Sequence, residues 1–156
     1  MLEQHYLTSL FEPKSVAVIG ASERENSVGS IIFKNILDAG YKGRLYAINP
    51  KHETIHGVQA HASIEEIGAR VELAVICTRP QTVPAIVEQC GRSGIKNVIV
   101  ITAGFAEAGH SGAALERKML EIARSYNVRV LGPNCLGLIR PTLGLNATFA
   151  KVTANA

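Results

Sequence analysis

Short apolar runs alternate along the chain with longer segments whose apolar residues recur at helical spacing. The runs are rich in Val, Ile and Ala and carry apolar residues on both faces, which is typical of strands buried on both sides. They predict five strands, at residues 15–20, 44–50, 73–77, 97–102 and 129–131. The other segments predict a leader helix at 2–11 and helices at 27–40, 64–67, 82–94 and 115–126, with Ser27 and Thr82 as N-caps.

Strands that alternate with helices pair in parallel, because each crossover carries the chain back across the sheet. The predicted fold is therefore α/β, a Rossmann-like doubly wound parallel sheet of about five strands with flanking helices. Residues 1–150 would form this single domain. No helix is expected after Gly137, where residues 142–149 could add an edge strand, and residues 151–156 would start a truncated linker to a further domain.

Composition narrows the class of protein. Apolar residues make up 47% of the chain and charged residues 19%, which excludes a disordered chain, a coiled coil and a collagen-like repeat. No apolar run reaches the roughly 18 residues of a membrane span. The net charge of +3 comes without a basic run, which disfavours nucleic acid and suits a small phosphate-bearing ligand. Cys77, Cys90 and Cys135 favour free thiols, so with no secretory signal we expect a cytoplasmic protein.

Ligands of open α/β sheets bind beyond the carboxyl ends of the strands, so the turns after the five strands are the candidate site. The first turn, from Gly20 to Gly29, could let the backbone approach a phosphate, although it lacks the GxGxxG spacing and could be an ordinary turn with a packing glycine. We expect residues 23–27 of this turn to be mobile without ligand.

The remaining turns include basic residues that bear on the kind of ligand. The second strand ends at Asn49-Pro50-Lys51 with no acid for the ribose of NAD, and Lys51 could pair with the ribose phosphate of NADP or of coenzyme A, or be solvated. The third turn, 78–84, combines an apolar surface with Arg79 and suits an adenine ring. The fourth and fifth turns, 102–107 and 132–137, could each be plain, but five such turns on one sheet edge favour a ligand site.

Five motifs in order carry a family resemblance: VAVIGAS, INPK, CTRP, ITAGF and GPNCLG. Together they resemble the N-terminal CoA-binding domain of the nucleoside-diphosphate-forming acyl-CoA synthetases. That family includes ADP-forming acetyl-CoA synthetases and, more distantly, the α subunit of succinyl-CoA synthetase. The same domain begins bacterial protein lysine acetyltransferases. The resemblance extends from the leader helix to about Phe149.

The resemblance implies a coenzyme A site, with no catalytic residue and no metal in this segment. In chain order it would bind the CoA phosphates, one further phosphate, the adenine, the pantetheine arm and the thiol end. The residues carried over are Gly20, Ala21, Ser22, Val28 and Gly29; Asn49, Pro50 and Lys51; Thr78, Arg79, Pro80 and Val83; Thr102, Ala103, Gly104 and Phe105; and Asn134 and Cys135.

The resemblance also implies the reaction of a longer parent chain. Family members convert acyl-CoA, ADP and phosphate into acid, CoA and ATP, through an acyl phosphate and a phosphorylated histidine. That histidine belongs to a following flavodoxin-like domain, and ATP binds a nucleotide-grasp segment. The 156 residues would therefore bind CoA without catalysing, and any homo-oligomer would form through the parent. The five histidines here are expected in loops or in the leader helix.

Two alternatives stay open on sequence grounds. The same order of strands and helices fits an NAD(P)-binding oxidoreductase domain, although the first and second turns lack its usual glycine and acid positions. A stand-alone regulatory CoA-binding protein with this fold is the other alternative.

Overall fold

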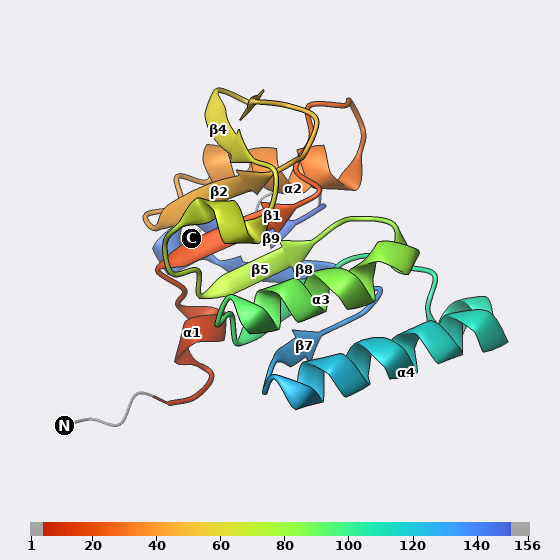
Figure 1. Ribbon diagram of the computed structural model, residues 1–156. Coiled ribbons are helices and arrows are strands. Elements are labelled where there is room, and N and C mark those ends of the chain that lie inside the picture. Colours follow the sequence, from red (N-terminus) through yellow and green to blue (C-terminus); the bar gives the residue numbers. More distant parts are fainter. Residues whose placement is uncertain (1–4, 151–156) are drawn as a thin grey trace.

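A seven-stranded sheet forms the centre of the molecule, which we describe from a computed structural model covering residues 5–150 (Figure 1). The strand order is β3-β4-β2-β1-β5-β6-β7, and every neighbouring pair is parallel except β3 with β4. The strands are β1 (Ser15–Ile19), β2 (Arg44–Ile48), β3 (Thr54–Ile55), β4 (Val58–His61), β5 (Leu73–Ile76), β6 (Asn97–Val100) and β7 (Arg129–Leu131). The α/β doubly wound fold is thus confirmed.

The five predicted strands are neighbours in the order β2-β1-β5-β6-β7, and the added strand β4 continues the parallel part of the sheet beyond β2. Every residue of β1, β5 and β6 is buried, which explains why all but Ser15 and Asn97, the first residues of β1 and β6, are apolar. The short hairpin of β3 and β4 adds two strands beyond the predicted number. Its two-residue turn, His56-Gly57, has φ of 47° and 77°, the left-handed pair that a tight hairpin turn requires.

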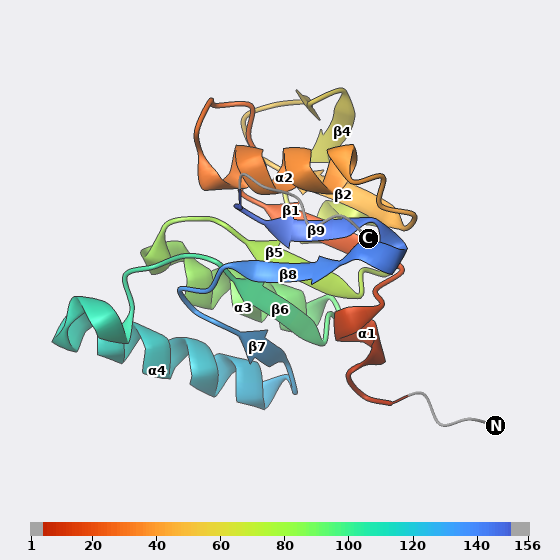
Figure 2. The same cartoon turned by 180° about the vertical axis from the view of Figure 1, so that it is seen from behind.

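Two layers cover the sheet (Figures 1 and 2). Helices α3 and α4 pack on one face, while α2 and a second hairpin, β8–β9, pack on the other. Side chains of β1 alternate accordingly, since Ala17 and Ile19 face α3 while Val16 and Val18 face α2. The helices are α1 (Thr8–Phe11), α2 (Val28–Asp38), α3 (Val83–Arg92) and α4 (His110–Ser125), with short 3-10 turns η1 (Ile64–Ile67), η2 (Pro80–Thr82), η3 (Ala106–Ala108) and η4 (Pro141–Leu143).

The end of the chain differs from the prediction. Residues 142–149 do not extend the main sheet; instead β9 (Leu145–Thr148) pairs with β8 (Gly137–Arg140) in a separate two-stranded antiparallel sheet. A 3-10 turn, η4, lies where no helix was expected. The reason is burial, because Leu145 and Ala147 join the core on the α2 face and so cover apolar surface beside that helix.

The predicted helix starts are partly right. The Ser27 hydroxyl accepts the Ser30 N–H at 3.2 Å and caps α2 as predicted. The Thr82 hydroxyl instead donates to the Arg79 carbonyl oxygen at 2.7 Å, because a 3-10 turn precedes α3. The expectation for histidines is wrong at two positions, since His61 ends β4 and His110 begins α4.

Two predicted segments extend outside the described residues. Of the leader helix predicted at 2–11, Thr8–Phe11 form α1 and residues 5–7 are not helical, while residues 2–4 lie outside the described part of the chain. The linker predicted at 151–156 lies entirely outside. Within residues 5–150, no helix has the length and apolar character needed to cross a membrane.

Candidate functional site

The five predicted turns meet at the carboxyl edge of the sheet, where two pockets adjoin. The larger, about 570 Å³, lies over the ends of β1, β2 and β5. The smaller, about 320 Å³, lies over the ends of β5 and β6 and reaches Asn134 beyond β7. Cys77 and Thr78 line both pockets, so the two form one path across the sheet edge. Such a position, outside the carboxyl ends of parallel strands, is where open α/β sheets bind ligands.

Ten of the predicted site residues line these pockets, and every predicted turn contributes at least one. The larger pocket holds Gly20, Asn49, Pro50, Lys51, Thr78 and Arg79. The smaller pocket holds Val28, Thr102, Ala103 and Asn134, together with Thr78.

The other predicted residues lie beside the pockets without lining them. Three of them, Ala21, Val83 and Phe105, are fully buried, so their side chains pack in the core and support the turns from below. The remaining five are Ser22, Gly29, Pro80, Gly104 and Cys135.

Close contacts join the first two turns. A Cβ at Gly29 would fall 2.9 Å from the carbonyl carbon of Gly20 and nearer still to its oxygen, so the two ends of the first turn touch. Asn49 then connects this turn to the second: its Nδ2 donates to the Ala21 carbonyl oxygen at 2.9 Å, and its Oδ1 accepts the Lys51 N–H at 2.8 Å. The Asn49 amide therefore acts as a brace within the protein.

The third, fourth and fifth turns are joined in the same way. The Thr102 hydroxyl donates to the Thr78 carbonyl oxygen at 2.7 Å, and the Asn134 N–H donates to the Thr102 carbonyl oxygen at 3.0 Å. A Cβ at Gly104 would fall 2.9 Å from Cγ of Pro80, so only glycine allows these two turns to approach so closely. The floor of the smaller pocket is thus a connected set of backbone segments.

Two carboxylates fix the fourth turn. Glu107 Oε1 accepts the N–H groups of Gly104 at 2.5 Å and Phe105 at 3.2 Å, and Glu116 Oε2 accepts the N–H of Ala106 at 3.1 Å. The hydrogen bonds that Glu107 accepts, from Gly104 foremost, lower its pKa. The turn therefore keeps its shape through charge-assisted hydrogen bonds from its own neighbours.

The larger pocket is cationic. Arg24, Lys51 and Arg79 line it, all three are exposed, and none forms an ion pair within residues 5–150. No carboxylate is among the described residues that line either pocket. The candidate site residues predicted from the sequence did not include Arg24. The only sequence feature that could have indicated Arg24 is its position inside the first turn. Three exposed cations that form no ion pair among the described residues suit an anionic ligand.

Comparison with known proteins identifies the family of this chain. The family model for the CoA binding domain matches residues 14–141. The chain belongs to this CoA-binding family. The ADP-forming acetate–CoA ligase of Methanocaldococcus jannaschii is 47% identical over 140 residues, which cover 90% of this chain and 19% of that protein. The α subunit of ADP-forming acetate–CoA ligase I of Pyrococcus furiosus is 42% identical over 147 residues, covering 92% and 32%.

Solved structures agree with the family. A dinucleotide-forming acetyl-coenzyme A synthetase 1 of Ca. Korarchaeum cryptofilum, in complex with phosphate and ADP, matches with a TM-score of 0.88 and 38% identity, over 92% of this chain and 30% of that one. The resemblance carried by the five motifs is thus confirmed, and the NAD(P) and stand-alone alternatives are not favoured. The CoA-binding domain spans about a fifth to a third of the length of these relatives.

The cysteines of the CoA-binding domain are weak nucleophiles. Cys77, Cys90 and Cys135 are free thiols. Burial raises the pKa of Cys77 to about 12, with a smaller contribution from Cys135, and burial also raises the pKa of Cys135 itself. Both thiols that lie near the path therefore stay protonated at neutral pH, and a protonated thiol does not attack.

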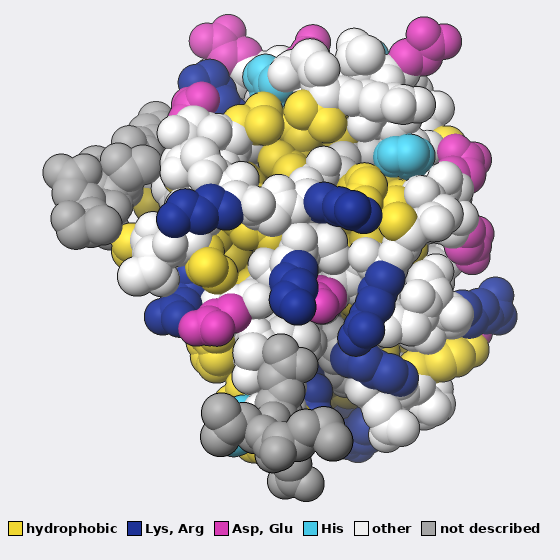
Figure 3. Space-filling view, turned by 90° about the vertical axis from the view of Figure 1, so that its left-hand side faces the viewer, with side chains coloured by type: hydrophobic (Ala, Val, Ile, Leu, Met, Phe, Trp, Pro, Cys, Tyr) yellow, Lys and Arg dark blue, Asp and Glu magenta, His cyan; other side chains and the backbone are white. Residues whose placement is uncertain are grey.

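Basic side chains of the CoA-binding domain also gather at the opposite, amino-terminal edge of the sheet (Figure 3). An exposed Lys or Arg stands at or just before the start of four parallel strands: Lys14, Arg44, Lys96 and Arg129. The net charge of +3 is therefore not concentrated at the pockets. The cations of the larger pocket are distinguished by lining a hollow that has no carboxylate among its described lining residues.

Proposed function

We propose that this domain binds coenzyme A across the carboxyl edge of its sheet and serves as the CoA-binding module of an ADP-forming acyl-CoA synthetase. The observation that carries the proposal is the continuous path of two pockets, cationic at one end and free of carboxylates among its described lining residues. Coenzyme A has the matching form, a phosphorylated ADP joined to a long, uncharged arm. The family match supports this ligand.

The side chains that line the two pockets indicate which part of coenzyme A would lie in each pocket. Arg24, Lys51 and Arg79 would bind the phosphates in the larger pocket, where Ile64 and Ile86 offer apolar surface to the adenine. The pantetheine arm would cross at Thr78 into the smaller pocket. There Val28, Ile101 and Phe149 provide apolar contacts, and the hydroxyls of Thr78 and Thr102 lie nearby for amide groups. The thiol would then lie toward Asn134 and Cys135.

The parent reaction would need segments that these residues do not supply. Relatives named as ADP-forming ligases for acetate and for 4-hydroxybutyrate are several times longer than this chain. We therefore assign the phosphorylated histidine and the ATP site to flavodoxin-like and nucleotide-grasp segments of the parent, together with any homo-oligomer contact. We favour a synthetase over a protein acetyltransferase because these relatives are ligases. The three free cysteines support a reducing compartment such as the cytoplasm.

Calorimetric titration of the domain with CoA, NADP and NAD tests the ligand. We expect saturable CoA binding and much weaker binding of both dinucleotides. Lys51→Gln should weaken CoA binding about tenfold, since a charged hydrogen bond to phosphate contributes about 1.4 kcal/mol. Arg44→Gln removes the same charge at the amino-terminal edge, where no side-chain partner of Arg44 is found within residues 5–150, and should change affinity less than about twofold. A preference for NADP, or no CoA binding at millimolar ligand, would overturn the proposal.

A further inference from the structure

The first turn carries two glutamates close to the proposed phosphate site, where negative charge opposes binding. Glu23 and Glu25 are both exposed and lie either side of Arg24. Their surroundings differ. The Glu23 carboxylate accepts the backbone N–H of His56 at 2.5 Å, across to the hairpin of β3 and β4. Glu25 forms no side-chain hydrogen bond or ion pair within residues 5–150.

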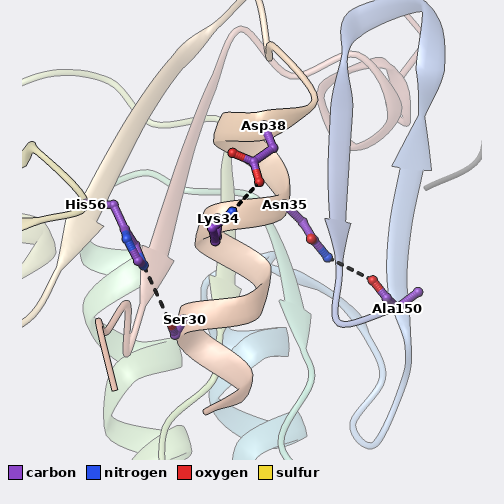
Figure 4. Close-up of polar contacts among 6 residues, drawn as sticks. All are labelled: Ser30, Lys34, Asn35, Asp38, His56 and Ala150. Atoms are coloured by element: carbon purple, nitrogen blue, oxygen red, sulfur yellow. Dashed lines mark hydrogen bonds and ion pairs between the residues drawn. The ribbon is translucent and has the colours of Figure 1, made fainter. Parts of the chain in front are cut away.

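The hairpin turn that receives Glu23 is itself fixed on α2. His56 Nε2 lies 3.3 Å from the Ser30 hydroxyl oxygen (Figure 4). The His56 ring also stacks 6.3 Å from the ring of the fully buried Phe33. On the other side of α2, Asn35 Nδ2 donates to the Ala150 carbonyl oxygen at 3.1 Å. The helix therefore has contacts on both sides, and the His56 side chain connects the hairpin turn to it.

Arg24 lies between these anchored points. Its N–H donates to the Ser22 hydroxyl at 3.0 Å, its carbonyl oxygen accepts the Ser27 N–H at 3.1 Å, and it lines the larger pocket. Because the neighbouring Glu23 is bound to the hairpin, the backbone at residue 24 has little freedom to turn Arg24 away from the pocket. An arginine already in place loses less conformational entropy when it meets a phosphate.

We infer that the contact of Glu23 with His56 is a latch that positions Arg24 for the phosphates before the coenzyme arrives. The inference rests on the proposed function, because it assumes that the larger pocket receives phosphate. Glu23 is a positioning residue in this account, and Arg24 is the group that touches the ligand.

The latch and simple charge repulsion predict opposite signs for one substitution. Glu23→Ala removes a negative charge near the ligand, so repulsion alone predicts tighter CoA binding. The latch predicts that Glu23→Ala weakens CoA binding about threefold to tenfold. Glu25→Ala is the matched control, since it removes the same charge from the same turn without breaking a bond, and it should bind CoA as the wild type does or slightly more tightly. Glu23→Gln keeps an oxygen that can accept the His56 N–H and should stay within about twofold of the wild type.

A double-substitution cycle tests whether the latch acts through Arg24. We expect Glu23→Ala to lose its effect on CoA affinity when Arg24→Gln is already present. Equal penalties for Glu23→Ala in both backgrounds would overturn the positioning role, as would tighter CoA binding by Glu23→Ala alone. Urea unfolding of each variant shows whether it is folded under the titration conditions, and Glu23→Gln keeps the test available if Glu23→Ala is unstable.

Hydrogen exchange without ligand separates failure of the latch from failure of the proposed function. The latch predicts that Glu23→Ala speeds exchange of the amides of Arg24, Ser27 and His56 at least tenfold and that Glu25→Ala does not. Unchanged exchange in Glu23→Ala would support the mobile turn expected from the sequence and would overturn the latch. If the wild type binds no CoA, the proposed function fails, and this exchange result still decides whether the latch exists.

Discussion

Gly29→Ala probes the closest contact in the site. A Cβ at this position would fall 2.9 Å from the Gly20 carbonyl carbon and closer to its oxygen, and neither atom can yield as a flexible side chain would. Gly29 is buried in the first turn of α2. Overpacking of this kind costs about 3 kcal/mol at the upper end, whereas alanine regains about 1 kcal/mol of helix propensity. The expected net loss in the free energy of unfolding is about 2 kcal/mol, or roughly 4–8 °C in Tm.

The same substitution should act on the ligand. The start of α2 must move away from the end of β1, which displaces Gly20 and Val28 on the two pockets, so we expect CoA affinity to fall at least tenfold. Gly94→Ala is the control: its φ of 77° imposes strain of about 1–2 kcal/mol. The added Cβ would meet no heavy atom within 4 Å. Because Gly94 also lies far from the pockets, its substitution should not change CoA affinity. Urea unfolding and calorimetry measure both effects. A Gly29→Ala protein with wild-type stability and affinity would refute the contact as the reason for this glycine.

Two further predictions concern titratable groups. The pKa of Glu107 is lowered in the folded state from its ordinary 4.5, so its contribution to stability is present above that pH and is lost as pH falls through the folded value. Denaturant titrations should therefore find Glu107→Gln less stable than the wild type at pH 7, with a difference that shrinks below pH 4.5; a gap independent of pH would contradict the carboxylate's role. The pKa of Cys77 is raised to about 12, so iodoacetamide at pH 8 should label native Cys77 far more slowly than the same residue in urea. Cys135, whose pKa is raised less, should react first, and labelling of Cys77 at the rate of a free thiol would argue against its protonated state.

The sequence predicts the buried part of this fold well because burial leaves a local record. The strands β1, β5 and β6 are buried along their whole length, and apart from Ser15 and Asn97 at the starts of β1 and β6 they are apolar. Short apolar runs of this kind between helical segments predict buried strands. The hairpin of β3 and β4 leaves no such record. Its strands have two and four residues, are half-buried and include polar side chains, so only the left-handed turn at His56-Gly57 could have indicated it.

The hairpin of β8 and β9 shows a second limit. The sequence contains an apolar segment near residues 142–149, but whether that segment joins the edge of a sheet or covers its face depends on which surface is still uncovered. That surface is defined by α2, more than a hundred residues away in the chain. Local patterns carry no information on such a contact.

The candidate site, too, could be predicted from the sequence only in part. Its position follows from the order of strands and helices, which places all five turns on one edge. The directions in which the side chains of these turns point do not follow from that order. Val83 and Phe105 lie in predicted site turns yet face the core, Asn49 binds neighbouring backbone, and Arg24 faces the larger pocket. These outcomes depend on packing against the core and on contacts between turns, which single motifs cannot reveal.

The junction of the two pockets at Cys77 and Thr78 has a consequence for inhibitor design. Small molecules selected separately for the larger and the smaller pocket would meet at this junction, where a short linker could join them. A joined compound gains from the high effective concentration of its second half, often by a factor of about 100 or more. One half would exploit cations and the other apolar surface, so the pair would combine two kinds of selectivity that neither fragment has alone.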